Sequence, residues 1–421
     1  MKPPKLDAHA LLSALIISII ISFIIASLLL LHYYNRENWM RYETNTRLQR
    51  NFQSAINLVI SDSVKFNNTD SMSLDLFSDE KDSVFIKKEY WGVFNLAMVK
   101  AYSKGRSITK RFLYGSELRD TLNACLYLAD HQRPLQISGS TTLNGNVFLP
   151  KSGIKAGVID GKSYEGKELV KGIIFKSDTS LTSLNQSLLM HAYELLQLCL
   201  DKNFRNSHSI ALDDTLVHSF ENPTRYCFIN TVNKLRSRKI KGRVILMSDS
   251  LIQIRADVQL EDAIVVAPEI YVDPGFSGSV QLIAGKKITI GKNCTLRYPS
   301  AVILLKDAAD NHQGLIEVSD SSLITGLIFA HSAESDRFKN QVHLNKGSKI
   351  EGVVYVHGFL QTAGSVYGTV LADFFTHKSI LATYENCLVD VIIDRSKLSS
   401  HFVSPTLVKM PGRLNIVKWL N

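Results

Sequence analysis

The first hydrophobic feature along the chain is an uninterrupted apolar run near the N-terminus. Residues 10–31 read ALLSALIISIIISFIIASLLLL, and four serines are the only polar members. The 21 residues Leu11–Leu31 form a helix of about 30 Å at roughly 1.5 Å per residue, the thickness of a bilayer's hydrocarbon core. We therefore predict a single membrane-spanning helix that contacts the lipid bilayer through Leu11–Leu31.

A cleaved signal peptide is the alternative interpretation of this run. Such a peptide has a shorter apolar region followed by a small-residue cleavage site, whereas here His32-Tyr33-Tyr34 follows. The tyrosine pair suits the headgroup interface. We therefore expect an uncleaved anchor in the inner (cytoplasmic) membrane.

Two signals disagree about the orientation of this anchor. Two lysines precede the run and four arginines follow it: Lys2, Lys5, Arg36, Arg41, Arg47 and Arg50. Counting positive charges favours a cytoplasmic C-terminal side. A short tail before a long body is nevertheless the usual layout of an exported signal-anchor protein, and we expect the body to be periplasmic or extracellular.

Helical periodicity continues beyond the run. One apolar stripe contains Leu48, Phe52, Ala55, Ile56 and Val59, at the spacing of one helix face. We predict one long helix, or two nearly continuous ones, as far as about Asp62. Residues 1–62 are thus expected to form the membrane anchor and an extended helix.

A small strand-rich region is expected over residues 63–134. Ser63–Glu80 is polar and is predicted to be a loop. Three short segments then resemble strands of an antiparallel sheet, Val84–Glu89, Val93–Ala101 and Ile108–Leu113. Asp120–Asp130 fits either a helical turn or a strand.

From about Leu135 the motif [Ile/Val]-x-Gly-x-[Ile/Val] recurs. Its glycines are Gly172, Gly242, Gly326, Gly352 and Gly368. Apolar runs of similar length lie at residues 263–267, 280–284 and 301–305, and from Val244 onward the run centres are 16 to 26 residues apart. Self-similarity at about 20 residues is typical of a solenoid.

The content of each repeat indicates the type of solenoid, because the repeats contain short strands and no helix. Two or three strands per repeat with glycine or asparagine corners predict a parallel β-helix; a β-sandwich is the alternative. Leu184–Leu200 has apolar residues at helical spacing, and Asp201–Ser237 is polar. We therefore predict a mainly β protein with a parallel β-helix over residues 135–421, a helical insertion at about 184–237, and a terminal strand or cap at 409–421.

Composition excludes several other classes. The 421 residues are 45% hydrophobic and 21% charged, with five cysteines and a net charge of +9. A disordered chain, a disulfide-rich mini-scaffold and a polytopic membrane protein are thereby excluded. The positive charge is spread along the chain without interleaved aromatic residues, so we expect no nucleic-acid partner; it suits an anionic polymer or lipid headgroups.

Recognisable cofactor and metal motifs are missing from the sequence. Gly157–Ser163 resembles a phosphate-binding loop but has three residues between its glycines instead of four, and we expect a β-turn. Gly275-Phe-Ser277-Gly278 lacks the spacing of a nucleophile elbow. The five cysteines include no Cys-x-x-Cys pair, so we expect no zinc site, no cofactor, and buried structural thiols.

Enzymes with a β-helix need carboxylates or bases clustered on one face. The candidates here are Asp257, Glu261, Asp262, Asp307, Asp310, His331, His343 and His357. The simpler interpretation is that they are loop and corner residues facing water. We assign none of them a catalytic role from the sequence.

Two stretches resemble known families. Residues 8–62, with Gln49-Arg50-Asn51-Phe52-Gln53 in the helix that follows the span, resemble the N-terminal region of minor type IV pilin-like assembly proteins. Residues 324–358 resemble β-strand repeats found in some of those proteins and are also similar to bactofilins, which are polymer-forming β-helical scaffolds. The prepilin Gly and Glu around the cleavage site are absent, and no functional residue is transferred.

Three functional hypotheses follow. The leading one is a non-enzymatic structural component of a pilus- or secretion-like cell-envelope assembly, with protein partners in that assembly. The second is a membrane-tethered β-helical protein that binds or cleaves polysaccharide. The third is a cytoplasm-facing scaffold of bactofilin type.

Overall fold

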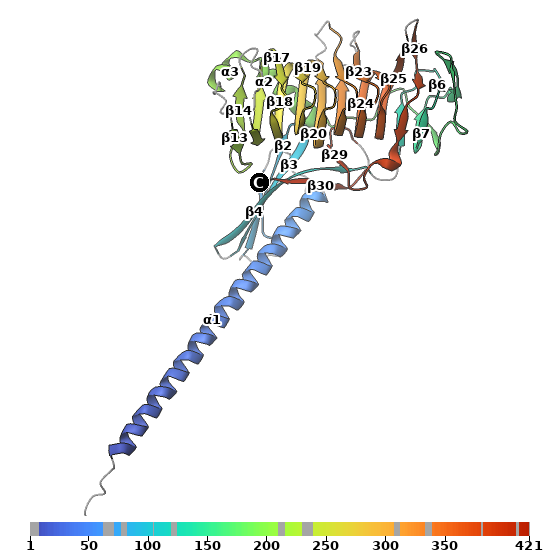
Figure 1. Ribbon diagram of the computed structural model, residues 1–421. Coiled ribbons are helices and arrows are strands. Elements are labelled where there is room, and N and C mark those ends of the chain that lie inside the picture. The colour runs from blue at the N-terminus through green and yellow to red at the C-terminus, as the bar shows by residue number, and fades with distance from the viewer. Residues whose placement is uncertain are drawn as a thin grey trace, which may run out of the picture. The chain divides into compact units, whose positions relative to one another are not determined.

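The computed structural model describes residues 8–61, 71–76, 82–103, 105–118, 124–208, 215–229, 239–306, 312–332, 339–379, 382–409 and 412–420. The protein is mainly β with one long apolar helix at its N-terminus (Figure 1). It divides into two compact units. The first contains Met1–Leu58, Ser71–Ile86 and Val99–Thr109, and the second contains Val59–Asp70, Lys87–Met98 and Lys110–Asn421.

The first unit is built on the helix α1, Ala8–Ile60. Its apolar first part is exposed, and the predicted stripe in its second part is buried at Leu48, Ala55 and Ile56. Arg47 Nε lies 3.2 Å from Asp82 Oδ2, and Asn51 Nδ2 donates to the same oxygen at 3.2 Å. The predicted continuous helix is therefore present, and it ends two residues before Asp62.

The small sheet predicted after the helix is also present. Its strands are β1 (Ser71–Leu74), β2 (Asp82–Trp91), β3 (Phe94–Ser103), β4 (Arg106–Glu117), β29 (Val403–Ser404) and β30 (Leu414–Leu420). They follow the order β1-β2-β3-β4-β29, and β30 also pairs with β4 in an antiparallel register. The predicted C-terminal strand thus joins this sheet.

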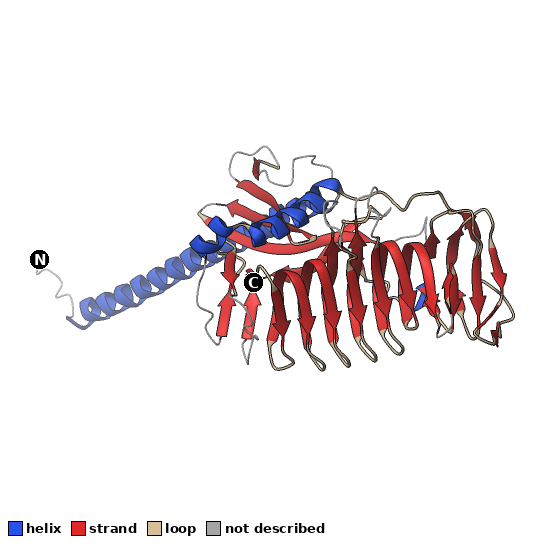
Figure 2. Cartoon of the chain, turned by 90° about the horizontal axis from the view of Figure 1, so that it is seen from above, coloured by secondary structure: helices blue, strands red, loops and turns tan. Residues whose placement is uncertain are grey.

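Most strands of the second unit pair in parallel and form a closed, barrel-like set (Figure 2). They are β5 (Ala124–Leu128), β7 (Thr142–Asn144), β8 (Asn146–Leu149), β12 (Ile174–Lys176), β13 (Thr215–His218), β14 (Arg225–Phe228), β15 (Lys239–Gly242), β16 (Val244–Met247), β17 (Leu251–Ile254), β18 (Gln259–Val272), β19 (Ser277–Ile290), β20 (Thr295–Leu305), β21 (Leu315–Val318), β22 (Leu323–His331), β23 (Asn340–Leu344), β24 (Lys349–Thr362), β25 (Ser365–Lys378) and β28 (Ile392–Asp394). Smaller pieces accompany them: β6 (Leu135–Ser138), β9 (Ile154–Ala156), β26 (Thr383–Glu385), β27 (Cys387–Val389) and the short helix η2 (Arg395–Lys397). We call the strands of the first list, without these smaller pieces, the parallel body. The segment 120–130, whose sequence fits either a helical turn or a strand, is a strand over Ala124–Leu128.

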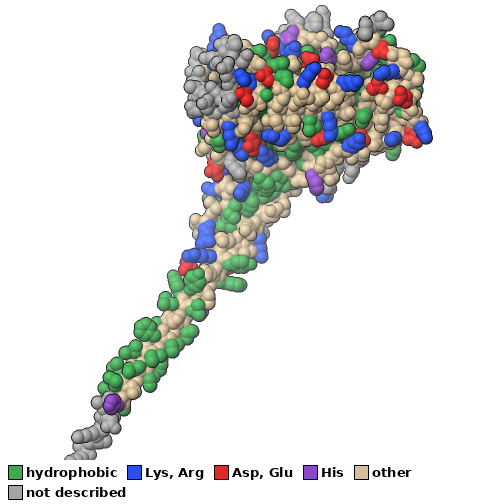
Figure 3. Space-filling view, in the orientation of Figure 1, with side chains coloured by type: hydrophobic (Ala, Val, Ile, Leu, Met, Phe, Trp, Pro, Cys, Tyr) green, Lys and Arg blue, Asp and Glu red, His purple; other side chains and the backbone are tan. Residues whose placement is uncertain are grey.

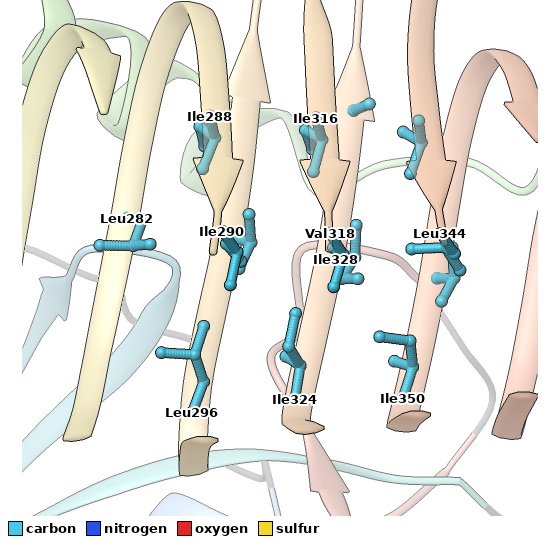
Figure 4. Packing of buried hydrophobic residues seen from close by; sticks show 14 of the residues in the cluster. Leu282, Ile288, Ile290, Leu296, Ile316, Val318, Ile324, Ile328, Leu344 and Ile350 are labelled. Carbon is cyan, nitrogen blue, oxygen red and sulfur yellow. The ribbon is translucent and has the colours of Figure 1, made fainter. Parts of the chain in front are cut away.

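Inward-facing aliphatic residues of the parallel body stack in register. The central row contains Cys227, Leu246, Val265, Leu282, Val302, Ile328, Val354, Val370, Leu126 and Val147. Each is at most 1% exposed, and Figure 4 shows part of this packing around Leu282 and Ile328. The sequence-based prediction that Ile328, Val354 and Val370 share one ladder is confirmed.

The order of strands in the central row differs from their order in the chain. From β14 to β25 the row follows the sequence, but β25 then pairs with β5, which is the first strand of the parallel body in the chain. β8 and β12 continue the row beyond β5. The strands β5, β8 and β12 come early in the chain, but in the spatial order of the row they lie beyond β25.

The continuous apolar runs reflect burial on both faces of the central row. In residues 263–267, Ala263, Val265 and Ala267 belong to the inner core, while Ile264 and Val266 belong to a second core on the outside. That outer core also contains residues from α2 (Gln186–Leu200) and from the segments 91–96 and 398–420. A strand covered on both sides reads as an uninterrupted hydrophobic run.

One polar residue interrupts these runs, and it has a structural role. Gln281 is buried; its Oε1 accepts from the Val93 amide at 2.9 Å and its Nε2 donates to the Trp91 carbonyl at 3.0 Å. The Trp91 indole N–H donates to the Asp262 carbonyl at 3.1 Å. These contacts fix the turn between β2 and β3 on the parallel body, and they satisfy polar groups that would otherwise be costly to bury.

The glycine of the recurring motif occupies a position where a side chain does not fit. All five motif glycines have positive φ, and at Gly326, Gly352 and Gly368 the values are +150°, +148° and +154°. A Cβ atom on these three would lie 1.8–1.9 Å from the carbonyl oxygen of the preceding strand in the row. Backbone thus packs on backbone at this corner, which explains why the motif requires glycine.

Candidate functional site

Three titratable side chains meet where the central row ends on adjacent strands. His331 closes β22, His357 lies in β24 and Asp373 lies in β25. The residues just before them, Ala330, Val356 and Ala372, are paired in register. Parallel pairing therefore places His331, His357 and Asp373 side by side.

The two histidine rings stack, and one of them faces the carboxylate. The ring centroids of His331 and His357 are 5.4 Å apart. His357 Nδ1 lies 2.7 Å from the Ser332 carbonyl oxygen, so Nδ1 carries the proton and donates. This leaves His357 Nε2 directed at Asp373 Oδ2, 3.5 Å away.

A lysine approaches the same oxygen of Asp373, and aromatic rings lie close by. Lys339 Nζ lies 3.7 Å from Asp373 Oδ2 and 4.9 Å from the centroid of Phe374. The ring of His131 stacks on the same Phe374 at 4.1 Å. We call His131, His331, Lys339, His357 and Asp373 the histidine–aspartate cluster.

Burial controls the electrostatics of the cluster. The Asp373 side chain is 6% exposed, and burial raises its pKa, while His357, Lys339 and His131 oppose the rise. Burial lowers the pKa of His331 to about 4, with the neighbouring His357 adding to the effect. Burial also lowers the pKa of His131. The cluster is thus biased toward neutral His331 and His131 and a carboxyl group that holds its proton more tightly than usual.

Several polar atoms around the cluster make no hydrogen bond to the described residues. They are Asp373 Oδ2, His131 Nε2, His331 Nδ1, Ser332 Oγ, and both amide atoms of Asn340. Buried polar atoms are normally paired, so this set has unused capacity to exchange protons or to hold a polar ligand. Within the described ranges no group of three or more His, Cys, Asp or Glu residues could hold a metal ion.

The other sequence candidates lie elsewhere. His343 occupies a different row, opposite Glu317 and Gln361. Asp257 pairs with Arg255 on a turn. Asp307 and Asp310 lie outside the described residues, as do Lys2 and Lys5.

The adjacent acids Glu261 and Asp262 form ion pairs. Lys418 Nζ donates to the two carboxylate oxygens of Asp262 at 2.7 and 2.8 Å, and lies 3.7 Å from Glu261. Lys241 donates to Glu261 at 3.0 Å, which lowers the pKa of that carboxyl. These acids attach the C-terminal strand to the parallel body and do not form an open catalytic pair.

Asp373, His131 and Lys339 were not among the sequence candidates. Asp373 is the one charged residue of the apolar stretch VLADFF inside β25, and the sequence alone does not show which residues face it. Its approach to His131 depends on β5 lying beside β25, an arrangement that local periodicity does not encode.

The remaining motifs have structural explanations. Gly157–Ser163 forms the hairpin of β10 (Val158–Ile159) and β11 (Lys162–Ser163), turning at Asp160 and Gly161 with φ of +51° and +74°. The expected β-turn is therefore confirmed. All five cysteines are buried and free, and burial raises the pKa of Cys199 to about 12, which keeps it protonated.

A cavity of about 630 Å³ lies beside α2. Tyr193, Leu196 and Leu200 of the helix line one side, and Leu251 and Leu305 line the other. Its lining is mostly apolar, and the thiol of Cys199 is already bonded to the Ser248 carbonyl at 2.7 Å. Within the described residues, none of the buried polar side-chain atoms without a hydrogen-bond partner belongs to the lining of this cavity.

Comparison with known proteins adds little to this picture. No protein-family profile matches the sequence, and no curated protein matches it. Among solved structures, the competence-associated pilin ComZ from Thermus thermophilus aligns with 90% of this chain and 97% of its own, at 10% identity and a TM-score of 0.20. A TM-score this low carries no argument about fold or function.

Proposed function

We propose that the protein is a membrane-anchored, non-enzymatic structural component of a pilus- or secretion-like cell-envelope assembly. One observation carries the proposal: the first part of α1 is a long, fully exposed apolar helix. Its most hydrophobic window has a mean hydropathy of 3.0, and none of that window is buried. Figure 3 shows hydrophobic side chains along this part of the helix.

The span is compatible with a bilayer in its polar details as well. Ser13 donates to the His9 carbonyl at 2.9 Å, Ser18 to Leu15 at 2.9 Å, and Ser22 to Ser18 at 2.8 Å. These three hydroxyls are thus satisfied within the helix, as a lipid environment requires. Large exposed apolar surfaces on a soluble protein are unfavourable in water, and a bilayer would cover this one.

The parallel body supports a structural role. We propose that it is a parallel β-helix in which each repeat of the glycine motif begins one coil. The support is the unbroken register of the central row together with the glycine corners. Stacked coils make a stiff rod whose side chains are occupied mainly with packing, which suits a scaffold.

The pilin-like assignment rests on the helix and on the sheet beside it. The chain continues as one helix from the span into a second part whose apolar stripe is buried and which bonds to β2 through Asp82. This layout agrees with the sequence resemblance to minor pilin-like proteins. We place the anchor in the inner membrane, with the C-terminal body on the periplasmic or extracellular side and its partners among the other proteins of the assembly.

A second candidate function comes from the histidine–aspartate cluster. Histidines beside a buried carboxyl group are suited to acid–base chemistry, so a membrane-tethered protein that binds or cleaves polysaccharide is the alternative. Activity of the purified full-length protein on pectin, alginate or a glycosaminoglycan, lost in His357→Ala, would favour this alternative over the structural role.

Membrane extraction and topology reporters test the leading proposal. The full chain should resist carbonate and high salt, whereas a variant lacking residues 1–35 should be released. As a matched control, Ile20→Arg places a charge in the span and Trp39→Arg places one beyond it; only the first should weaken anchoring. An active phosphatase fused after Asn421 supports export. Release of the full chain by salt contradicts the span, and an inactive phosphatase with a fluorescent cytoplasmic fusion favours the bactofilin-like scaffold.

A further inference from the structure

The last strand of the central row, β12, has one parallel neighbour. Ile174, Phe175 and Lys176 pair with Val147, Phe148 and Leu149 of β8. Within the described residues β12 pairs with β8 alone. Ile174 therefore extends the inner ladder by one more position, at the end of the row.

This end of the row is uncovered. Ile173 is 61% exposed, Ile174 is 51% exposed and Phe175 is 39% exposed. Phe175 stacks on Phe148 at 5.0 Å, and Phe148 stacks on Tyr127 at 5.5 Å. Both the aliphatic ladder and the aromatic stack thus end on an open side, without the next layer that covers the preceding members.

The backbone of β12 also has a free side. The Ile173 carbonyl accepts from the Val147 amide at 2.9 Å, and the Ser177 amide donates to the Leu149 carbonyl at 2.8 Å. Because a parallel pair uses alternate residues on each side of a strand, the N–H and C=O groups of Ile174 and Lys176 are directed away from β8. This edge is a template for one more strand.

The opposite end of the parallel body, where β13 and β14 are the terminal strands of two neighbouring rows, is different. There the terminal strands β13 and β14 bury their inward residues, Leu216 and Cys227, to 5% and 1% exposure. Only Val217, which is 60% exposed, is a large exposed apolar residue on these two strands. An uncovered inner ladder is therefore a property of the β12 end.

Charge around β12 indicates the kind of strand that fits. Lys171 and Lys176 flank the apolar residues and both are exposed, and the nearest carboxylates along the chain, Glu168 and Asp178, lie outside the segment 169–177. Lysine on an edge strand opposes pairing with an identical edge, which disfavours a second copy of this chain. Carboxylates on an incoming strand would instead neutralise the two lysines.

We propose that the free edge of β12 is a docking site for an extended segment of a partner protein, which adds as a further strand and carries carboxylates on either side of a β-branched core. The Ile174 and Lys176 backbone groups supply the hydrogen bonds, and Ile174 and Phe175 supply the apolar contact. This proposal does not depend on the membrane anchor or on the pilin-like assignment.

A labelled strand peptide tests the proposal on the full chain in detergent micelles. The probe is Glu-Val-Thr-Ile-Thr-Val-Glu with an N-terminal fluorophore, followed by fluorescence anisotropy, and its counterpart has lysine at both ends. The wild type should bind the glutamate peptide in preference to the lysine peptide. Ile174→Lys should bind the glutamate peptide about tenfold more weakly or worse, because it removes the central apolar contact. Val217→Lys, a change of an exposed apolar strand residue at the other end of the parallel body, should bind like the wild type.

A second variant and an exchange measurement keep the test independent of folding effects. Lys171→Glu combined with Lys176→Glu changes only exposed residues and should reverse the preference between the two peptides. Amide exchange within residues 171–177 should slow when the glutamate peptide is bound. No binding by the wild type, or equal binding by all variants, overturns the proposal. Self-association of the wild type that Ile174→Lys abolishes in sedimentation also overturns it, because the occupant is then a second copy.

Discussion

Gly352→Ala tests whether the glycine corner is a point of backbone-on-backbone packing. The glycine has φ of +148°, and an added Cβ would lie 1.9 Å from the Gly326 carbonyl oxygen and 2.9 Å from Phe402 Cζ. The carbonyl belongs to the neighbouring strand of the row, so it cannot rotate away as a side chain would. Relief requires the two strands to separate locally or the corner to change conformation.

Two contributions determine how much free energy of unfolding Gly352→Ala should lose. A positive φ at a residue with a Cβ costs about 1–2 kcal/mol. Overpacking that shifts backbone costs about 1–3 kcal/mol more. Gly352→Ala should therefore lower the free energy of unfolding by about 2–5 kcal/mol, a large share of the roughly 5–15 kcal/mol typical of a folded domain.

Gly161→Ala is the matched control for this prediction. Gly161 also has a positive φ, +74°, but no atom lies within 4 Å of the position that a Cβ would occupy, so only the conformational part, about 1–2 kcal/mol, applies. Both variants can be compared by guanidinium unfolding of the full chain in non-ionic detergent, monitored by circular dichroism. Equal losses in the two variants would show that the close carbonyl contact has no energetic consequence, and the reasoning would fail.

Three further predictions concern the ladder, the cluster and the turn on Gln281. Val354→Asp places an unpaired charge in the inner ladder and should lower the free energy of unfolding by about 3–5 kcal/mol. A normal melting temperature for this variant would mean that the side chain does not point inward. The pKa of His331 is lowered to about 4 from about 6.5 in the unfolded chain, so the unfolded state binds more protons between these values, and stability is lost as pH falls from about 6.5 to about 4. His331→Asn should therefore lose less stability than the wild type as the pH falls over that window. Parallel curves of stability against pH for the two proteins would contradict the lowered pKa of His331. Asp373, whose pKa is raised, gains stability as the pH falls, and it does so in both proteins. Gln281→Leu leaves the buried Val93 amide without its acceptor and should cost about 1–3 kcal/mol, whereas Gln253→Leu, on a half-buried strand position, should have a smaller effect in the same unfolding assay.

Local features of the protein were predictable because they depend on neighbours in the sequence. The span and the helix as far as Val59 follow from apolar spacing alone. The motif glycines, such as Gly326 and Gly352, indicated corners because no other residue tolerates that backbone. The runs at 263–267 and 301–305 marked strands, although their unbroken hydrophobicity arises from two separate cores that meet on opposite faces of the same strand.

The histidine–aspartate cluster was only partly predictable, for a topological reason. His331 and His357 are separated by one repeat, so their alignment follows from the period. His131 reaches Asp373 only because β5 lies beside β25, and no periodicity connects those two segments. Lys339 likewise lies between repeats, where sequence spacing does not determine position.

Because β5 lies beside β25, the fold cannot be completed until most of the chain has been synthesised. Thr369 Oγ1 donates to the Ala124 carbonyl at 2.9 Å, across 245 residues of chain. At roughly 5–20 residues per second, the ribosome adds those residues in about 12–50 s. The strands from β13 to β25 can pair in the order of their synthesis, but the edge of β5 that faces β25 stays uncovered until β25 has been added. A chain that stops before Val370 leaves that edge of β5 permanently without its partner, so incomplete products of this gene should be recognised and degraded and should not accumulate.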